Sequence, residues 1–500
     1  MTSFPIDLPT RQQSLRQTLD WSYNLLELGE QRIFRRLGVF VGGCSLEAVE
    51  ALANLPDDLP LDVISHVAAL IDKSLLNQEE QADGNPRVSM LETTREYALE
   101  QLHANGEQAT LRCAYARYYL RLAQTAEGFL LGREQRVWLD RLDQERNNLR
   151  AALRWAAESN DEAAIEIGLQ LGSALWQFWA YRGYLEEGRD QLARLLSLPG
   201  TLHSQLQAAR AKALTGAGLL AIRYSDYAEA GRLLEAGLQL WREQGNDGQQ
   251  GTALALDGLG WVASAFGDFA RARELYQASL QLHRELHTQG NSEAADVLAH
   301  LAMADFFDGG LVSAQALSEE SLRIKRILGE KWGIGFALYL LGCIALADSR
   351  YDEARTYLHE GLTLSNEAGI QLLRIFLLEA LAWLAIAPTK RRNPPLAAQA
   401  LSTAHSLRSM LRVPQPPQWR TLMQRVTGEV QAKVVTRKTL RGTHKGDLMG
   451  IAPTGKTVDI EMIDILAVKD GKITDHWNLV DQLGLLKQLG ALSGGETAHA

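Results

Sequence analysis

The sequence predicts a mainly α-helical protein of several domains that ends in a small antiparallel β segment. Three observations carry this prediction: a helical motif that recurs in mid-chain, a helix-rich N-terminal part that closes on two short alternating runs, and β-branched residues from about residue 430. Because 500 residues exceed what one core usually organises, we expect several domains. The expected boundaries are an N-terminal domain at 1–103, helical repeats at 104–428, a β segment at 429–492 and a tail at 493–500.

Composition narrows the class of protein. The formal net charge of −9 argues against coating nucleic acid, which draws on concentrated lysine and arginine. Three widely spaced cysteines, Cys44, Cys113 and Cys343, form no disulfide framework and no zinc pattern, so a reducing compartment fits best. The longest apolar run, 332–347, is shorter than the roughly 20 residues that span a bilayer. We expect a cytoplasmic protein with no membrane partner, no metal and no cofactor.

Residues 214–364 contain four copies of one motif. A Leu-x-x-Leu/Ala-Gly/Ala segment is followed nine residues later by an aromatic residue or leucine, and then by x-x-Ala. The copies are 214–218 with Tyr227 and Ala230, 256–260 with Phe269 and Ala272, 298–302 with Leu311 and Ala314, and 338–342 with Tyr351 and Ala354. These alanines step by 42, 42 and 40 residues, and a weaker copy begins at Tyr184.

The motif predicts helical hairpins that stack into a right-handed solenoid. A small residue lets the second helix approach closely, and the aromatic residue at the start of that helix fills the angle between the pair. Asp226 and Asp268 supply cap chemistry at the turns. An irregular helical bundle is the alternative, and four copies in phase favour the repeat. Four tryptophans are expected in the hairpin cores rather than in a ligand site: Trp155, Trp176, Trp179 and Trp241.

These hairpins resemble the tetratricopeptide repeat, whose small residues and aromatic residue occur in the same order. The period is six to eight residues longer than the 34 of that family, which implies longer helices or longer loops. The longer form resembles the repeats that follow the ATPase module in bacterial regulators of the STAND class. The resemblance implies a protein or small-molecule effector on the concave face, contacted by polar positions of the first helix of each hairpin.

The first hundred residues show a winged-helix pattern. Four amphipathic segments, 15–26, 30–40, 45–53 and 62–76, precede alternating runs at 75–78 and 87–91, and a further helix starts at Glu92. The phrases at 11–26, 34–43, 70–76 and 90–98 resemble the region just after the nucleotide-binding module of STAND-class ATPases. The resemblance places that module before Met1, outside this chain.

Winged helices often bind DNA, but the candidate recognition helix of this one lacks the positive charge that DNA binding requires. The candidate recognition helix at 62–76 carries one lysine and two aspartates, and the expected wing adds Glu79, Glu80 and Asp83. A helix in the major groove needs basic and amide side chains toward phosphates and base edges. We therefore expect a regulatory packing module and no direct DNA binding.

Residues 450–457 match the phosphate-loop pattern G-x-x-x-x-G-K-[ST] letter for letter. A working phosphate loop lies between a buried strand and a helix whose N-terminal amides point at the phosphates. Here an alternating strand pattern follows at 458–465, so the lysine is expected on a hairpin. We predict no nucleotide binding at this motif.

The C-terminal part is expected to form strands at 433–440, 457–468 and 472–478, with Asp470-Gly471 as a hairpin turn and a helix at 483–489. The text at 440–456 and 470–490 resembles the SnoaL-like polyketide or ester cyclases, which fold as a cone around an apolar pocket. This resemblance implies an intramolecular aldol-type closure with three candidate catalytic residues: Asp481 as acid/base, and His444 and His476 as pocket partners.

The cyclase-like part is shorter than a complete domain of that family. Residues 396–428 look like the last repeat helices, interrupted at 414–417, rather than a roof over the pocket. We therefore expect Asp481 to cap the final helix and both histidines to be exposed. A partial cone also leaves a sheet edge through which the chain could self-associate.

Two functions follow. The leading hypothesis is a non-catalytic, protein- or ligand-binding regulatory scaffold, the sensor portion of a STAND-type signalling or transcriptional regulator without its ATPase module. The rival is a SnoaL-like ester or polyketide cyclase carried on a repeat scaffold. Whether residues 396–428 cover the sheet at Asp481 separates the two.

Overall fold

The computed structural model describes residues 10–55, 60–80, 86–159, 161–199, 204–389, 391–411, 413–431, 434–445, 453–469, 472–480 and 488–489. The chain divides into two compact units. The first comprises Met1–Ala263, Ala270–His300 and Arg323–Lys331, and the second comprises Ser264–Phe269, Leu301–Leu322 and Trp332–Ala500. Helices dominate both units and a small antiparallel sheet follows them, which confirms the predicted fold class.

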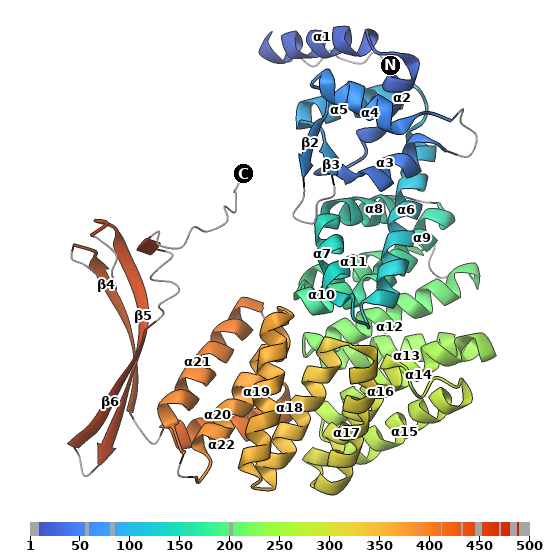
Figure 1. Ribbon diagram of the computed structural model, residues 1–500. Coiled ribbons are helices and arrows are strands. Elements are labelled where there is room, and N and C mark those ends of the chain that lie inside the picture. Colours follow the sequence, from blue (N-terminus) through green and yellow to red (C-terminus); the bar gives the residue numbers. More distant parts are fainter. Residues whose placement is uncertain are drawn as a thin grey trace. The chain divides into compact units, whose positions relative to one another are not determined.

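The N-terminal part of the first unit is a winged helix, as predicted (Figure 1). A two-residue strand that the sequence did not reveal completes its sheet in the order β1-β3-β2. The hairpin starts two residues later than expected, because the buried residues Leu75 and Leu76 both bond back to the Leu70 carbonyl and stay with the preceding helix. The elements are α1 Thr10–Asn24, α2 Leu28–Leu37, β1 Cys44–Ser45, α3 Leu46–Ala53, α4 Val63–Asp72, β2 Asn77–Glu80, β3 Pro86–Ser89 and α5 Glu92–Ala104.

Six helices lead from the winged helix into the repeats, and α6 packs on both α8 and α9. They are α6 Gln108–Phe129, α7 Gln135–Gln144, α8 Arg146–Glu158, α9 Glu162–Ala174, α10 Trp176–Arg182 and α11 Leu185–Leu196. The α10–α11 hairpin is the weaker copy of the repeat. Leu185 begins α11 as Tyr227 begins α13, and the two residues are 42 positions apart.

The four strong copies form helical hairpins in the predicted places. Tyr227, Phe269, Leu311 and Tyr351 are each the first residue of a second helix. The helices are 16 to 18 residues long, so helix length rather than loop length accounts for the long period. Their bounds are α12 Gln207–Arg223, α13 Tyr227–Glu243, α14 Gln249–Ala265, α15 Phe269–Glu285, α16 Ser292–Phe307, α17 Leu311–Leu328, α18 Lys331–Ala347 and α19 Tyr351–Glu367.

Each hairpin turn contains one residue in the left-handed region, two positions before the second helix. These residues are Gly183, Ser225, Gly267, Gly309 and Ser349, with φ of +77°, +61°, +81°, +90° and +59°. A second left-handed set follows each second helix of the strong copies: Gly245, His287, Gly329 and Gly369. A residue in this region ends a helix and reverses the chain, which is why glycine holds most of these positions.

The small residue of the motif permits the close approach of the two helices. A Cβ on Gly218 would lie 2.6 Å from Cγ of Leu234, and one on Gly260 would lie 2.5 Å from Cε1 of Tyr276. Gly342 faces Leu358 in the same way, at 2.5 Å from Cδ2. The partner side chain stands seven residues into the second helix each time, so the contact recurs with the repeat.

After the repeats come α20 Gln371–Ile386, α21 Pro394–Leu411 and α22 Pro417–Gln431. An antiparallel sheet follows in the order β4-β5-β6, with bounds Val434–Thr443, Thr457–Lys469 and Lys472–Val480. The predicted strands are confirmed, whereas most of the predicted helix at 483–489 lies outside the described residues. In the described part of the chain, no helix is long and apolar enough to cross a membrane.

The phosphate-loop pattern lies on the β4–β5 hairpin, as expected. Thr457 begins β5, so a strand follows Lys456 where a phosphate loop needs a helix. The Lys456 ammonium donates to the Leu489 carbonyl at 3.2 Å. The lysine therefore serves a local hydrogen bond, and the helix dipole that would attract a phosphate is missing from this position.

We predict that Gly260→Ala lowers the free energy of local unfolding of the α14–α15 hairpin by about 1–3 kcal/mol, because overpacking a filled interior forces side chains apart. Tyr276 is fully buried and has no space to retreat. The matched control is Gly231→Ala on α13, where a Cβ would meet Val262 Cγ1 at an ordinary 3.6 Å. It should raise stability by roughly 0.5–1 kcal/mol through helix propensity. Native-state hydrogen exchange measures both local unfolding free energies. An unchanged value for the α14–α15 hairpin in Gly260→Ala would contradict the view that the helices approach closely at Gly260.

Candidate functional site

A polar cavity of about 60 Å³ lies among the repeat helices of the first unit. Its wall comes mainly from the first helices of successive hairpins, α10, α12, α14 and α16, with one residue from α15. A cavity of this size holds roughly four water molecules. Its polar lining residues are Gln177, Arg223, Asp257, His283, Glu293, Asp296 and His300, and Trp176 and Trp261 are its aromatic lining.

Asp257 and His300 form the central pair of the wall. The Asp257 Oδ1 and His300 Nδ1 atoms are 2.8 Å apart, and the two side chains are only 9% and 12% exposed. His300 also stands edge-on to Trp261, with ring centroids 4.6 Å apart. In a neutral imidazole whose Nδ1 donates to the carboxylate, Nε2 keeps its lone pair and can accept a hydrogen bond.

A buried lysine lies behind the wall of the cavity, where it contacts the lining residue Asp296. The Lys325 ammonium is 1% exposed and lies 2.7 Å from both Asp296 Oδ1 and Glu330 Oε2. It also donates to the Ser292 hydroxyl at 2.7 Å. Burial alone would lower the pKa of Lys325, but the Asp296 and Glu330 carboxylates outweigh it and raise that pKa. The lysine therefore stays charged and holds its partners in place, which is a structural role.

Gln177 stands out in this wall. Its side chain is 8% exposed, and its Oε1 atom has no hydrogen-bond partner among the described residues. An unpaired buried amide group costs about 1–3 kcal/mol, so such groups usually find a partner. The cavity is thus a polar site in which the Gln177 acceptor oxygen is unsatisfied.

Burial also shifts titration around the cavity. It lowers the pKa of His283, although the nearby Asp257 carboxylate opposes that shift. It raises the pKa of Glu293, and repulsion by Asp296 adds to this effect while Lys325 opposes it. Low solvation of these groups is typical of sites that act on a ligand as well as of structural networks.

Sequence reasoning missed this site, although the signal was present. Asp257 and His300 stand inside two copies of the recurring motif, at positions that are otherwise uncharged. The other copies carry Thr215, Ala299 and Tyr339 at the first position and Gly216, Gly258 and Leu340 at the second. Trp179 is 1% exposed, as expected of a core residue, whereas the half-buried Trp176 packs beside Gly216 of α12 and also lines the cavity.

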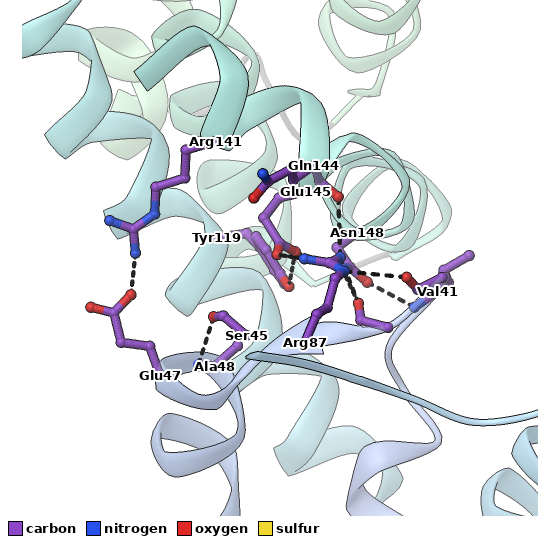
Figure 2. A network of polar contacts seen from close by, with 12 residues as sticks. Val41, Ser45, Glu47, Ala48, Arg87, Tyr119, Arg141, Gln144, Glu145 and Asn148 are labelled. Carbon is purple, nitrogen blue, oxygen red and sulfur yellow. Dashed lines mark hydrogen bonds and ion pairs between the residues drawn. The ribbon is translucent and has the colours of Figure 1, made fainter. Parts of the chain in front are cut away.

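A second polar network fixes the wing of the winged helix (Figure 2). Arg87 on β3 pairs with Glu145, the N-cap of α8, and donates to the Gly43 and Gln144 carbonyls at 2.9 and 3.1 Å. Tyr119 on α6 donates to the other Glu145 oxygen at 2.8 Å. Burial alone would lower the pKa of Arg87, but the hydrogen bond that it donates to Glu145 and the charge of that carboxylate, with smaller contributions from Tyr119 and Cys44, together raise this pKa.

Asn148 on α8 completes this network. Its side-chain oxygen accepts from the Val41 amide at 2.7 Å, and its nitrogen donates to the Gly43 carbonyl at 2.9 Å. It is fully buried, so these bonds are shielded from water. The wing is therefore docked on α6 and α8 through satisfied polar groups.

The candidate recognition helix carries little positive charge. Helix α4 contains neither lysine nor arginine, and its N-cap is Asp62. Lys73 directly after it pairs with Glu30 of α2. Lys73 at this helix end is thus engaged within the winged helix, and Arg87 of the wing is engaged by Glu145 of α8.

The predicted cyclase residues fall in three different situations. Asp481 lies outside the described residues. His444 is 6% exposed in the β4–β5 connection, where its Nδ1 accepts from the Thr454 amide at 3.1 Å, so the expectation that it is exposed was wrong. His476 pairs with Leu466 on β5, whereas the strand end next to His444 pairs at Thr457. Nine residues of strand, roughly 30 Å, separate those positions, so the register does not bring the histidines together.

The two helices that cover most of 396–428, α21 and α22, pack on α20, the first helix after the repeats. Met423 and Val426 of α22 join Ala382 and Ile386 of α20 in one apolar cluster. Trp419 is buried against aromatic rings of the second unit, with centroids 4.8 Å from Phe307 and 5.2 Å from Tyr339. Their apolar contacts are thus with the repeats. Among the described residues, no group of three side chains could hold a metal ion.

Three known families match three successive parts of this chain. Residues 26–103 match the winged helix-turn-helix domain, residues 209–285 the tetratricopeptide repeat, and residues 412–489 the SnoaL-like polyketide cyclase family. The chain is therefore a three-part protein of a winged helix-turn-helix domain, tetratricopeptide repeats and a SnoaL-like segment. The last match includes α22, which the sequence had assigned to the repeats.

Relatives of known name match parts of the chain. A Mycobacterium tuberculosis protein named as an HTH-type transcriptional regulator is 41% identical over 178 residues, 36% of this chain, and a Mycobacterium bovis regulator matches equally. The aligned part covers only 20% of those regulators. Aklanonic acid methyl ester cyclase of Streptomyces peucetius is 40% identical over 57 residues, which are 11% of this chain and 39% of that enzyme.

Among solved structures, a Signal Transduction ATPase with Numerous Domains protein with a tetratricopeptide repeat sensor, from Pyrococcus horikoshii, covers 86% of this chain and 68% of its own. The identity is 13% and the TM-score is 0.34, which is too low to support an argument about function. The STAND assignment therefore stays a prediction from the sequence.

We predict that Glu145→Gln lowers the free energy of unfolding of the winged-helix region by about 3–5 kcal/mol, because it leaves the Arg87 guanidinium buried without a counter-charge. The Arg87 side chain is only 12% exposed. The control is Glu47→Gln, which breaks the more exposed pair with Arg141 in the same view (Figure 2). It should cost less than about 1 kcal/mol. Urea unfolding of both variants tests this, and equal losses would show that the Arg87 pair is not special.

Proposed function

We propose that this chain is a non-catalytic binding and regulatory scaffold whose repeats hold an effector in the cavity around Asp257 and His300. The observation that carries the proposal is the Gln177 Oε1 atom, which has no hydrogen-bond partner among the described residues, in a wall built mainly by the first helices of successive hairpins. Tetratricopeptide hairpins present their first helices to ligands, and this cavity lies on those helices. The regulator names of the mycobacterial relatives support a role in controlling transcription.

We further propose that the winged helix serves mainly as a packing module within such a regulator. The names of the relatives and the helix-turn-helix match point toward DNA, against this proposal. Its support is electrostatic: helix α4 lacks basic residues, Lys73 pairs with Glu30, and Arg87 pairs with Glu145. Binding to duplex DNA draws most of its affinity from free lysine and arginine near phosphates.

A thermal-shift panel of amines, carboxylic acids, sugars, nucleotides and short peptides tests the effector proposal. We expect at least one class to raise the melting temperature in a saturable way, because a ligand that binds only the folded chain stabilises it. Leu254→Trp narrows the cavity from a half-buried wall position and should abolish that shift. The control, Gln239→Met on an exposed face of α13, should keep it.

A panel without any saturable ligand, or a shift that Leu254→Trp leaves intact, would contradict the effector proposal. Duplex DNA belongs in the same panel at near-physiological salt. We expect no saturable DNA binding, and sequence-specific binding would give the winged helix a DNA-reading role instead.

The rival function is a SnoaL-like ester or polyketide cyclase, favoured by the match over 412–489 and by the Streptomyces relative. In that case Asp481 would move a proton beside a substrate carbonyl, with His444 or His476 in the pocket. The test is turnover of an ester-bearing polyketide by the whole chain and by Asp481→Asn. On the scaffold proposal we expect no turnover by either protein. Turnover that disappears in Asp481→Asn would establish the cyclase.

A further inference from the structure

The residues that line the cavity around Asp257 and His300 carry more acidic than basic side chains. Three carboxyl groups, from Asp257, Glu293 and Asp296, line it together with one guanidinium, that of Arg223. Asp257 already contacts His300, and Asp296 pairs with Lys325 behind the wall. Gln177 adds an acceptor oxygen that nothing in the described structure satisfies. The side chains that line the cavity thus have a negative formal charge and an unsatisfied acceptor oxygen, which suits a ligand that donates hydrogen bonds and carries positive charge.

The aromatic part of the wall fits the same kind of ligand. The Arg223 guanidinium already lies 5.9 Å from the centroid of the Trp261 ring, so this ring accepts a cation near it. The face of a tryptophan attracts cations through its quadrupole. Trp176 supplies a second aromatic side chain to the lining.

Size and access restrict the ligand further. About 60 Å³ admits a head group of a few non-hydrogen atoms but not a nucleotide or a sugar. Asp296 is 31% exposed, so a carboxylate of the site reaches solvent and can meet an arriving cation. Lys325 does not satisfy the Gln177 oxygen, because its ammonium bonds to Asp296, Glu330 and Ser292.

We infer that the cavity binds a primary ammonium head group, with Gln177 Oε1 and the Asp257 and Asp296 carboxylates as its acceptors. This inference rests on the proposed effector function and names the chemistry of the effector. The ammonium belongs either to a free amine or to a lysine side chain of a partner peptide. Both present the same three N–H donors to the same acceptors.

The test is calorimetric titration of the whole chain with 1,4-diaminobutane, with N-acetyl-lysine methylamide and with neutral 1,4-butanediol as matched control. We expect saturable one-site binding of an amine and none of the diol. Gln177→Met keeps the side chain's size but removes the acceptor, and should weaken amine binding at least tenfold. Asp257→Asn should weaken it similarly, and Gln239→Met should not.

Gln177→Met also carries its own folding control. Because it removes a buried acceptor oxygen that has no hydrogen-bond partner among the described residues, the ligand-free variant should melt at about the same temperature as the parent or higher. Binding of the diamine alone supports a free amine, and binding of the lysine amide alone supports a partner's lysine. Either outcome supports the ammonium site.

Two results would overturn the inference. One is the absence of amine binding up to concentrations on the order of 10 mM, which corresponds to a free energy of only about −3 kcal/mol. The other is equal affinity of the parent and Gln177→Met. If instead a compound of another class binds and Leu254→Trp abolishes its binding, the effector function stands and only the ammonium assignment falls.

Discussion

The close approach of two helices at a residue without a side chain is the contact on which the repeats depend. Gly218 against Leu234, Gly260 against Tyr276 and Gly342 against Leu358 are the same contact in the first, second and fourth copies of the repeat. Because this contact sets which face of each helix turns inward, it also sets the phase of every other position in the hairpin. The left-handed turn residues then recur in the same phase, and the chain reverses where each helix has buried its apolar face.

The two polar networks, around Arg87 and around Asp257, differ in how completely their buried polar groups are hydrogen-bonded. Around Arg87, the guanidinium, the Glu145 carboxylate and the Asn148 amide all have partners, so the network is closed and rigid. Around Asp257 the pairs are also made, but Gln177 has none among the described residues. A closed network specifies one arrangement of the domain, whereas an incomplete one leaves a position for another molecule.

The fold could be predicted from the sequence where the spacing of recurring residues determines the structure. The hairpins could be predicted because Tyr227 and Phe269 mark helix starts and Gly218 and Gly260 mark close approach, all within one repeat. The shift of the wing hairpin could not, because Leu75 and Leu76 stay with α4 through bonds to Leu70 that a strand pattern does not reveal.

The cavity and the environment of His444 depend on contacts between distant residues. Asp257 and His300 are 43 positions apart and meet only once two hairpins have stacked. His444 is buried in the β4–β5 connection, where its Nδ1 accepts from the Thr454 amide. The expected exposure was wrong because the sequence pattern does not reveal this contact. Residues that differ from the other copies of a motif are therefore an informative signal in a repeat protein. They mark where a recurring geometry carries unusual side chains.

Stacking also decides what an occupied cavity would do. In a solenoid each hairpin contacts only its neighbours, so stability accumulates from one interface to the next. A ligand that touches α10, α12, α14 and α16 at once adds a link across several interfaces, and it stabilises the stack according to its concentration relative to its dissociation constant. Within the same unit α12 packs on α9, α9 packs on α8, and α8 holds the wing through Glu145. The cavity and the wing thus lie on one continuous series of packed helices within this unit.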